Sequence, residues 1–358
     1  MLNSRNVPYY ICRFGAFGEL PGLVERQCGN GGWAVYLIDH FFRSRDLIER
    51  LGLGENDLIL YIDSSREPEC RDFDAVAITV RDHCLKPPAV VVGIGGGTSL
   101  DFAKAVSNLL PNGGKAADYQ GFDLLPKPSI HKIGVPTLSG TGAESTRTCV
   151  MTNHEKSLKL GMNSDHTLFD QLVLDPDLTA TVPRLQYFLT GMDTFIHDVE
   201  FLSGRQRHPI GDAYARQSLD LCREVFLFKD MMAPENREKM MVASYFGGRA
   251  VCHGAVGLIH AFSMALSVVL GTPHGHANCI ALLALGEFYQ APLAEFREMQ
   301  SRQGIEVEKV VGGKLPEKTF DRLFQALQNY EMLLENELSE DFRTILTRDK
   351  IREIFTAM

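Results

Sequence analysis

In residues 90–104, Val90-Val91-Val92-Gly93-Ile94-Gly95-Gly96-Gly97-Thr98-Ser99-Leu100-Asp101-Phe102-Ala103-Lys104, a β-branched run is followed by a glycine cluster and then by a helical pattern. Consecutive glycines let the backbone approach a ligand closely, and the N–H groups that open the next helix can bind a pyrophosphate. The pattern is not the usual GxGxxG fingerprint, because Thr98 stands where the last glycine would fall, and no Gly-Lys-Ser/Thr closes a P-loop. A tight strand-to-helix turn without a ligand is the alternative.

The same alternation of short apolar runs and helical patterns extends through the first half of the chain. It predicts a parallel sheet covered on both faces, whose ligands bind beyond the carboxyl ends of the strands. The expected strands are Trp33–Ile38, Leu58–Ile62, Ala89–Val92, Ile130–Val135 and Leu172–Leu174, and the expected helices are Phe41–Leu51, Arg71–Asp82 and Ser99–Leu109.

The second half of the chain has helical periodicity and no convincing strand. We expect an α/β dinucleotide-binding domain over residues 1–178 and an all-helical metal and substrate domain over residues 179–358. Two amphipathic helices are expected in the tail, Thr319–Met358. The other expected helices include Thr190–Leu202, Asp212–Phe228, Asn236–Cys252 and Ala255–Leu270.

Composition excludes several classes of protein. Of 358 residues, 45% are hydrophobic and 23% charged, which is ordinary for a globular protein, and the net charge of -9 disfavours nucleic-acid and membrane-surface binding. The eight cysteines include no CxxC pair, so neither a zinc knuckle nor a disulfide scaffold is indicated. Because Met1–Tyr10 has no apolar signal segment, a reduced, cytoplasmic protein is expected.

A second loop, Pro136-Thr137-Leu138-Ser139-Gly140-Thr141-Gly142-Ala143-Glu144, follows another expected strand and is rich in hydroxyls and glycines. Two such loops suit one extended ligand with several polar groups, as a dinucleotide has. Asp39 ends the first expected strand, where an acidic residue can bind a ribose diol and repel a 2′-phosphate. A helix N-cap is the alternative for Asp39.

A set of metal-ligating residue types lies in the second half. Asp193 and His197 are four residues apart, so on a helix they share one face. His260 and His274 could add two nitrogens from a helix and the loop that follows it. One carboxylate and three imidazoles suit Fe²⁺ or Zn²⁺ better than Mg²⁺ or Ca²⁺. The alternative is that each histidine is a satisfied core residue.

This ordered set of motifs resembles the iron-containing alcohol dehydrogenase family, which is related to dehydroquinate synthase. Besides the residues above, the resemblance rests on Phe14-Gly15, Glu67-Pro68, Asp175-Pro176 and Pro273-His274-Gly275, and it covers roughly residues 10 to 290. It implies a dehydroquinate synthase-like fold, NAD as coenzyme, and Fe²⁺ first or Zn²⁺ second as the metal. The residues that it implies are the metal ligands Asp193, His197, His260 and His274, the pyrophosphate loop Gly95, Gly96, Gly97, Thr98 and Ser99 with Asp101 below it, Thr137, Ser139, Thr146 and Leu178 on the nicotinamide side, and Asp39 favouring NAD over NADP.

The chain departs from the family pattern near the third expected ligand. Many members carry a second His four residues after it, where this chain has Met264, and a thioether cannot relay a proton. Arg249, His253 and His276 flank the expected site instead, as candidate substrate residues. An Arg in the site would suit a carboxylate-bearing substrate. The alternatives are a surface cation for Arg249 and a packing role for His253.

The chain is most similar to one branch of the family, which oxidises the C8 hydroxyl of 3-deoxy-manno-octulosonate to an aldehyde in lipopolysaccharide sugar biosynthesis. We therefore expect NAD-dependent oxidation of a primary alcohol, an acidic sugar, by a homodimer with no nucleic-acid or membrane partner. The alternatives are a general alcohol or polyol dehydrogenase, an oxidase that passes electrons to O₂ at the same site, a dehydroquinate synthase-type lyase, and a metal-storing or regulatory binding protein.

Overall fold

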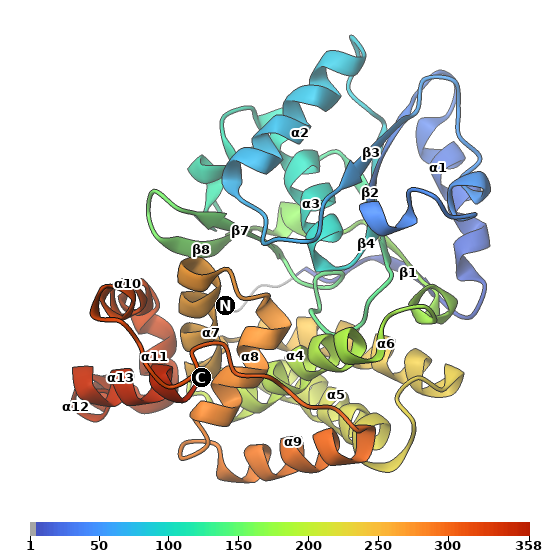
Figure 1. Ribbon diagram of the computed structural model, residues 1–358. Coiled ribbons are helices and arrows are strands. Elements are labelled where there is room, and N and C mark those ends of the chain that lie inside the picture. Colours follow the sequence, from blue (N-terminus) through green and yellow to red (C-terminus); the bar gives the residue numbers. More distant parts are fainter. Residues whose placement is uncertain (1–4) are drawn as a thin grey trace. The chain divides into compact units, whose positions relative to one another are not determined.

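The computed structural model describes residues 5–358, so the first four residues of Met1–Tyr10, the segment examined for an apolar signal, lie outside the described part (Figure 1). The chain folds into two compact units. One runs to Asn153 and resumes over Lys159–Thr181, and the other contains His154–Leu158 and Val182–Met358. The boundary expected at residue 178 for two separate domains stays a prediction.

The first unit is built around a six-stranded parallel sheet in the order β1-β9-β6-β4-β2-β3. All six residues of its strand β4 are buried, which explains the uninterrupted apolar run before the glycine cluster. The strands are β1 (Tyr9–Cys12), β2 (Ala34–Asp39), β3 (Leu58–Ile62), β4 (Val90–Gly95), β6 (His131–Pro136) and β9 (Gln171–Leu174), and the helices are α1 (Leu20–Cys28), α2 (Cys70–His83) and α3 (Gly97–Asn112).

Four strands of this unit were not expected. The edge strand β1 has only four residues, of which Tyr9 and Tyr10 are 69% and 60% exposed, so it gives a weak strand signal. A separate three-stranded sheet has the order β5-β8-β7, and its strands mix polar with apolar residues without regular alternation. Its strands are β5 (Gly121–Phe122), β7 (Thr148–Asn153) and β8 (Leu158–Asn163).

The helix expected over Phe41–Leu51 is wrong. This segment contains two short 3₁₀ turns, His40–Phe42 and Ile48–Arg50, closed by bonds such as that from the Arg43 N–H to the His40 carbonyl. The apolar side chains Phe42, Leu47 and Leu51 still reach the core. Separate turns therefore satisfy the apolar spacing that had indicated a continuous helix.

The second unit is helical, and no described residue after Leu174 lies in a strand, as expected. One core cluster unites its helices. The tail forms four helices instead of the expected two. Breaks fall at Asn329, where one helix ends, at Ser339, where a short turn begins, and at Thr347, which caps the last helix. The helices are α4 (Arg184–Ser203), α5 (Pro209–Phe228), α6 (Pro234–Val251), α7 (Leu258–Leu270), α8 (His274–Ala284), α9 (Gln290–Gln303), α10 (Glu317–Gln328), α11 (Glu331–Leu338), α12 (Phe342–Ile345) and α13 (Arg348–Ala357).

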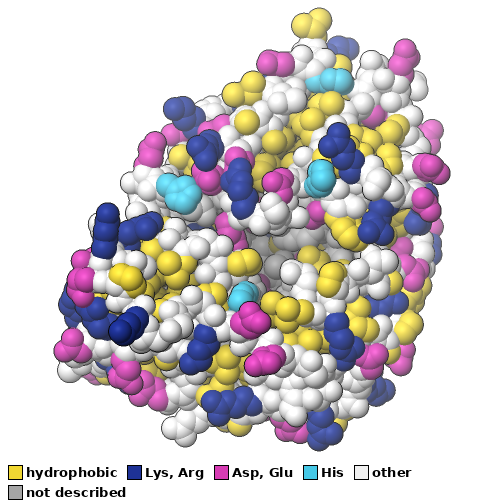
Figure 2. Space-filling model, in the orientation of Figure 1, with side chains coloured by type: hydrophobic (Ala, Val, Ile, Leu, Met, Phe, Trp, Pro, Cys, Tyr) yellow, Lys and Arg dark blue, Asp and Glu magenta, His cyan; other side chains and the backbone are white. Residues whose placement is uncertain are grey.

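The surface in Figure 2 carries charged side chains of both signs. On the face drawn in Figure 2, Lys and Arg side chains are interspersed with Asp and Glu, so no broad basic surface appears there. All eight cysteines are free. In residues 5–358, none of the helices has the length and apolar character needed to cross a bilayer.

Candidate functional site

Helix α4 supplies the first pair of candidate metal ligands. Asp193 is 1% exposed and His197 is also buried, and the four-residue spacing places both on one face of the helix. His260 lies in the first turn of α7, and His274 is the first residue of α8. Three helices of the same unit thus carry the four residues.

Three imidazole rings converge on one oxygen of the Asp193 carboxylate. The distance from Asp193 Oδ1 is 3.4 Å to His260 Nε2, 3.6 Å to His274 Nε2 and 3.7 Å to His197 Nε2. Donor atoms of Asp193, His260 and His274 all lie within 4.8 Å of one another, a set that does not include His197. The His197 ring instead stacks on that of His260, with centroids 4.7 Å apart and planes 10° apart.

Burial and the charges of neighbouring side chains shift the pKa values of this cluster. Burial would raise the pKa of Asp193, but His197, His274 and His260 lower it well below its usual range. Burial lowers the pKa of His197, against the opposing effect of Asp193. Burial also disfavours charge on His260, yet Glu200 and Asp193 raise its pKa to about 9. The carboxylate is therefore ionised, as a metal ligand must be.

These residues fit a divalent metal ion. Asp193 Oδ2 is buried and has no hydrogen-bond partner among the described residues, and buried polar atoms are rarely left so. Imidazole nitrogens with one carboxylate suit Fe²⁺ or Zn²⁺, whereas Mg²⁺ and Ca²⁺ prefer oxygen ligands. The donor set thus matches the chemistry of a transition-metal site.

Two residues of the cluster were missed by sequence reasoning. Asn278 Nδ2 donates to Asp193 Oδ1 at 2.6 Å and lies 3.2 Å from His260 Nε2. Glu200 contacts the other ring nitrogen of His260. Asn278 lies four residues after His274 and Glu200 lies three residues after His197, so each shares a helix face with an expected ligand.

The first glycine loop fits closely against its surroundings. Gly95 has φ +152°, in the region that favours glycine. A Cβ there would lie 2.6 Å from Ser99 Oγ and 2.9 Å from Asp39 Cβ. The end of β2 and the start of α3 therefore meet at this turn, and Asp39 lies beside the loop. Asp39 Oδ1 also accepts from the Phe41 N–H at 2.9 Å, so the capping role considered for it is present too.

The second loop packs against the first. A Cβ on Gly96 would lie 2.8 Å from Leu138 Cδ1, and one on Gly97 would lie 3.1 Å from Thr141 Oγ1. The Thr137 N–H donates to the Gly95 carbonyl at 2.9 Å. The two loops that we expected to share a ligand are therefore neighbours.

Each of the two loops contains a buried serine hydroxyl. Ser99 Oγ and Ser139 Oγ are buried without a hydrogen-bond partner among the described residues. Thr98 is half-buried at the second position of α3, where backbone N–H groups are unpaired within the helix. Leu178 packs against the core of the sheet from the turn Pro176–Thr179. These features fit the pyrophosphate and ribose groups of a dinucleotide.

Asp101 and Thr146 make buried hydrogen bonds next to these loops. Asp101 Oδ2 accepts from the Val150 N–H at 2.9 Å, and burial raises the pKa of Asp101 to about 6 although Lys104 opposes the shift. Lys104 is fully buried, and its Nζ donates to the Thr146 carbonyl at 3.0 Å and to Thr146 Oγ1 at 3.2 Å. Asp101 and Thr146 therefore stabilise the fold next to the loops, whatever they contribute to coenzyme binding.

The substrate candidates have different surroundings. Arg249 is 1% exposed, so its interpretation as a surface cation is wrong. His253 stacks on Tyr214, with centroids 6.1 Å apart, which is the packing role considered for it. His276 Nε2 lies 2.7 Å from the Glu308 carbonyl. Met264 packs against the helical core.

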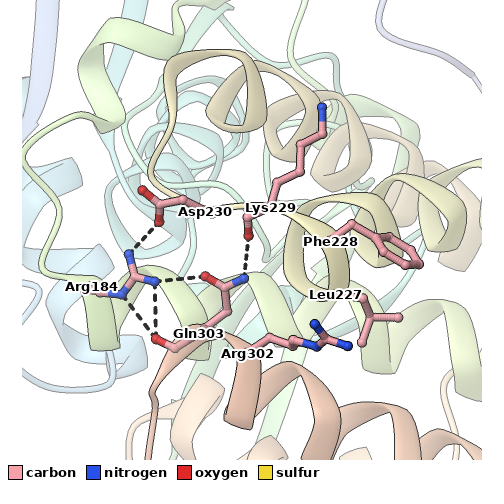
Figure 3. Close-up of a pocket in the computed structure, with 7 residues that line it drawn as sticks. All are labelled: Arg184, Leu227, Phe228, Lys229, Asp230, Arg302 and Gln303. Carbon is pink, nitrogen blue, oxygen red and sulfur yellow. Dashed lines mark hydrogen bonds and ion pairs between the residues drawn. The ribbon is translucent and has the colours of Figure 1, made fainter.

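A surface pocket of about 500 Å³ on the helical unit is not part of this cluster (Figure 3). Its polar groups bond to one another: Arg184 Nη1 donates to Asp230 Oδ1 at 2.6 Å, and Arg184 Nη2 donates to Gln303 Oε1 at 2.9 Å. None of the candidate metal or coenzyme residues lines it.

Sequence comparison gives the family. The model of the iron-containing alcohol dehydrogenase matches residues 8–176, and that of the C-terminal part of the Fe-containing alcohol dehydrogenase family matches residues 187–340. The chain belongs to the iron-containing alcohol dehydrogenase family. Its cluster of Asp193, His260 and His274 agrees with a metal site in a member of that family.

Two curated relatives align with much of the chain. An NAD-dependent methanol dehydrogenase of Bacillus methanolicus is 30% identical over 255 residues, covering 69% of this chain and 66% of the relative. A sulfoacetaldehyde reductase of Bilophila wadsworthia is 33% identical over 237 residues, covering 65% and 60%. The chain thus spans less than two thirds of the length of either relative.

Solved structures share the fold over the whole chain. The sulfoacetaldehyde reductase from Bifidobacterium kashiwanohense in complex with NAD+ superposes with a TM-score of 0.77 at 24% identity, covering 99% of this chain and 98% of that one. An alcohol dehydrogenase from Oenococcus oeni gives 0.81 at 21% identity, covering 99% of both. The expected fold, a parallel α/β unit followed by an all-helical unit, is confirmed.

Proposed function

We propose that this protein is a metal-dependent oxidoreductase that interconverts a primary alcohol and an aldehyde with NAD. The observation that carries the proposal is the convergence of His260 Nε2 and His274 Nε2 on the buried Asp193 carboxylate. His197, on the next turn of α4, would complete the ligand set. A bound divalent ion would act as a Lewis acid that lowers the pKa of the alcohol hydroxyl.

The residues of the α/β unit would bind the coenzyme. The N–H groups of Gly97, Thr98 and Ser99 open α3 and would bind the pyrophosphate. The Asp39 carboxylate would bind the adenosine ribose and repel the 2′-phosphate of NADP. Thr137 and Ser139 would contact the nicotinamide half of the coenzyme.

For the substrate we propose an acidic sugar, 3-deoxy-manno-octulosonate, oxidised at its C8 hydroxyl as a step in lipopolysaccharide sugar biosynthesis. The names of the curated relatives support the chemistry, because methanol is a primary alcohol and sulfoacetaldehyde is an aldehyde that carries an anionic group. Arg249, on α6, would bind the sugar carboxylate through its planar guanidinium. A homodimer in the cytoplasm stays our prediction for the assembly.

A substrate panel tests the proposal. Chelated enzyme is reloaded with Fe²⁺ or Zn²⁺ and given NAD with 3-deoxy-manno-octulosonate, 1,3-propanediol or methanol, while reduced nicotinamide and peroxide are followed in parallel. We expect metal-dependent NADH formation, fastest with the acidic sugar, and its loss in His260→Ala. Peroxide without NADH would instead indicate an oxidase.

The same panel with Arg249→Met isolates the carboxylate contact. Loss of a charged hydrogen bond is expected to lower kcat/KM for the acidic sugar roughly 10- to 100-fold relative to a neutral alcohol in the same variant. The ratio between substrates cancels any general loss of folded enzyme. An unchanged ratio would remove Arg249 from substrate binding.

A further inference from the structure

Glu200 is a buried carboxylate that contacts a candidate metal ligand from the side opposite the cluster. Its Oε2 lies 2.5 Å from His260 Nδ1, while His260 Nε2 faces Asp193 Oδ1 at 3.4 Å. Glu200 is fully buried, on the same helix as Asp193 and His197. The spacing of these three residues, four and then three, keeps them on one face of α4.

The other oxygen of Glu200 is fixed by the start of α7. Glu200 Oε1 accepts from the Ile259 N–H and from the His260 N–H, the latter at 3.3 Å. The N-cap of α7 is Gly257, which has no side chain to bond these N–H groups. Glu200, which lies on α4, therefore binds the first N–H groups of α7 in place of an N-cap side chain.

The glycine at this cap makes room for the carboxylate. A Cβ on Gly257 would lie 3.2 Å from Glu200 Oε1, 2.8 Å from Glu337 Oε2 and 3.4 Å from the Tyr289 hydroxyl. The Tyr289 hydroxyl also donates to Glu200 Oε1, at 3.5 Å. Because backbone and side-chain donors converge on Oε1, the carboxylate has little freedom to rotate away from His260.

We propose that Glu200 is a positioning residue, which holds the proton of neutral His260 on Nδ1 and leaves the Nε2 lone pair directed at the metal position. The inference rests on the proposed function, because it assumes that His260 binds a metal. A metal-ligating imidazole commonly donates its other N–H to a carboxylate, and loss of that partner typically weakens metal affinity 10- to 100-fold.

Glu200→Gln tests this role with little change of shape. The N–H groups of Ile259 and His260 require an acceptor, so the amide oxygen would face them and the amide NH₂ would face His260 Nδ1. An NH₂ group there favours the opposite tautomer, whose Nε2 carries a proton and cannot bind a metal. The cap on α7 would remain.

We expect Glu200→Gln to bind Zn²⁺ about 10- to 100-fold more weakly in competition with a chromophoric chelator, while its circular dichroism spectrum stays that of the folded wild type. In the zinc-loaded wild type, proton NMR should show a far-downfield imidazole N–H signal from His260, which Glu200→Gln should lack. Glu337→Gln is the matched control, since Glu337 lies beside the same glycine but its Oε2 accepts from Ser203 Oγ, at 3.0 Å. That variant should keep both the zinc affinity and the signal.

Wild-type zinc affinity in Glu200→Gln, or persistence of the downfield signal, would overturn the inference. If Glu200→Gln does not fold, Glu200→Asp keeps the charge but shortens the side chain, and the inference then requires weaker zinc binding than wild type. His260→Ala separates the two proposals. Wild-type zinc affinity in His260→Ala would refute the metal site itself, whereas weak binding there with normal binding in Glu200→Gln refutes the role of Glu200 alone.

Discussion

Asp39 illustrates how one side chain can serve both the fold and a ligand. Its Oδ1 accepts from the Phe41 N–H and thereby caps the turn that follows β2. Its Cβ also lies where a side chain on Gly95 would contact it. The capping contact needs only an oxygen acceptor, whereas discrimination against NADP needs the negative charge. The two roles can therefore be separated by a substitution that removes the charge and keeps the acceptor.

Asp39→Asn is that substitution. We expect the preference for NAD over NADP, measured as the ratio of their kcat/KM values, to fall about 10-fold or more, because the repulsion of the 2′-phosphate is lost. The melting temperature should be unchanged, since the Asn oxygen can still cap the turn. An unaltered coenzyme ratio at unaltered stability would leave Asp39 with the capping role alone.

At the level of single residues, the sequence points most clearly to residue types with few alternative uses. Asp193, His260 and His274 were predicted from residue type and the resemblance, and the structure brings them together. Glu200 and Asn278 were missed because a Glu or Asn on a helix is ordinarily a solvent-exposed residue, and only burial against His260 or Asp193 distinguishes it. That information depends on tertiary packing.

At the scale of elements, the position of α3 over β4 depends on one close contact. A Cβ on Gly93 would lie 2.6 Å from Ala103 Cβ, and it would also lie 3.3 Å from the Ser99 carbonyl. Gly93 therefore lets α3 approach the strand and brings its N-terminus to the glycine loop. The sequence predicted both elements well because β4 is almost entirely apolar and α3 has a long helical pattern, whereas β1 has only four residues and the strands of the small sheet mix polar with apolar residues.

Gly93→Ala should push α3 away from β4. We expect a loss of about 1–3 kcal/mol in the free energy of unfolding, measured by denaturant, together with weaker NAD binding. Ala103→Gly opens the space again, at a cost of about 1 kcal/mol in helix propensity. The double variant should therefore be more stable than the sum of the two single effects predicts. Strict additivity would show that the contact does not set the position of α3.

At the scale of the whole molecule, the two candidate sites belong to different compact units. All four candidate metal ligands lie within Val182–Met358, whereas both glycine loops lie in the unit that ends at Thr181. A ligand stabilises the state that binds it, so metal and coenzyme should each protect the elements that carry their own contacts. In the sequence, the change from alternating patterns to purely helical ones falls between the two sets of residues.

Hydrogen exchange followed by mass spectrometry measures this protection. At a free metal concentration about 100 times the Kd, exchange that requires release of the metal should slow about 100-fold, and it should do so in α4, α7 and α8. NAD should instead slow exchange at the β4–α3 turn and in the loop over residues 136–144. His260→Ala is the control, in which added metal should change little. Metal-dependent protection of equal size at the β4–α3 turn, or its absence from α7, would contradict the assignment of the metal to these three helices.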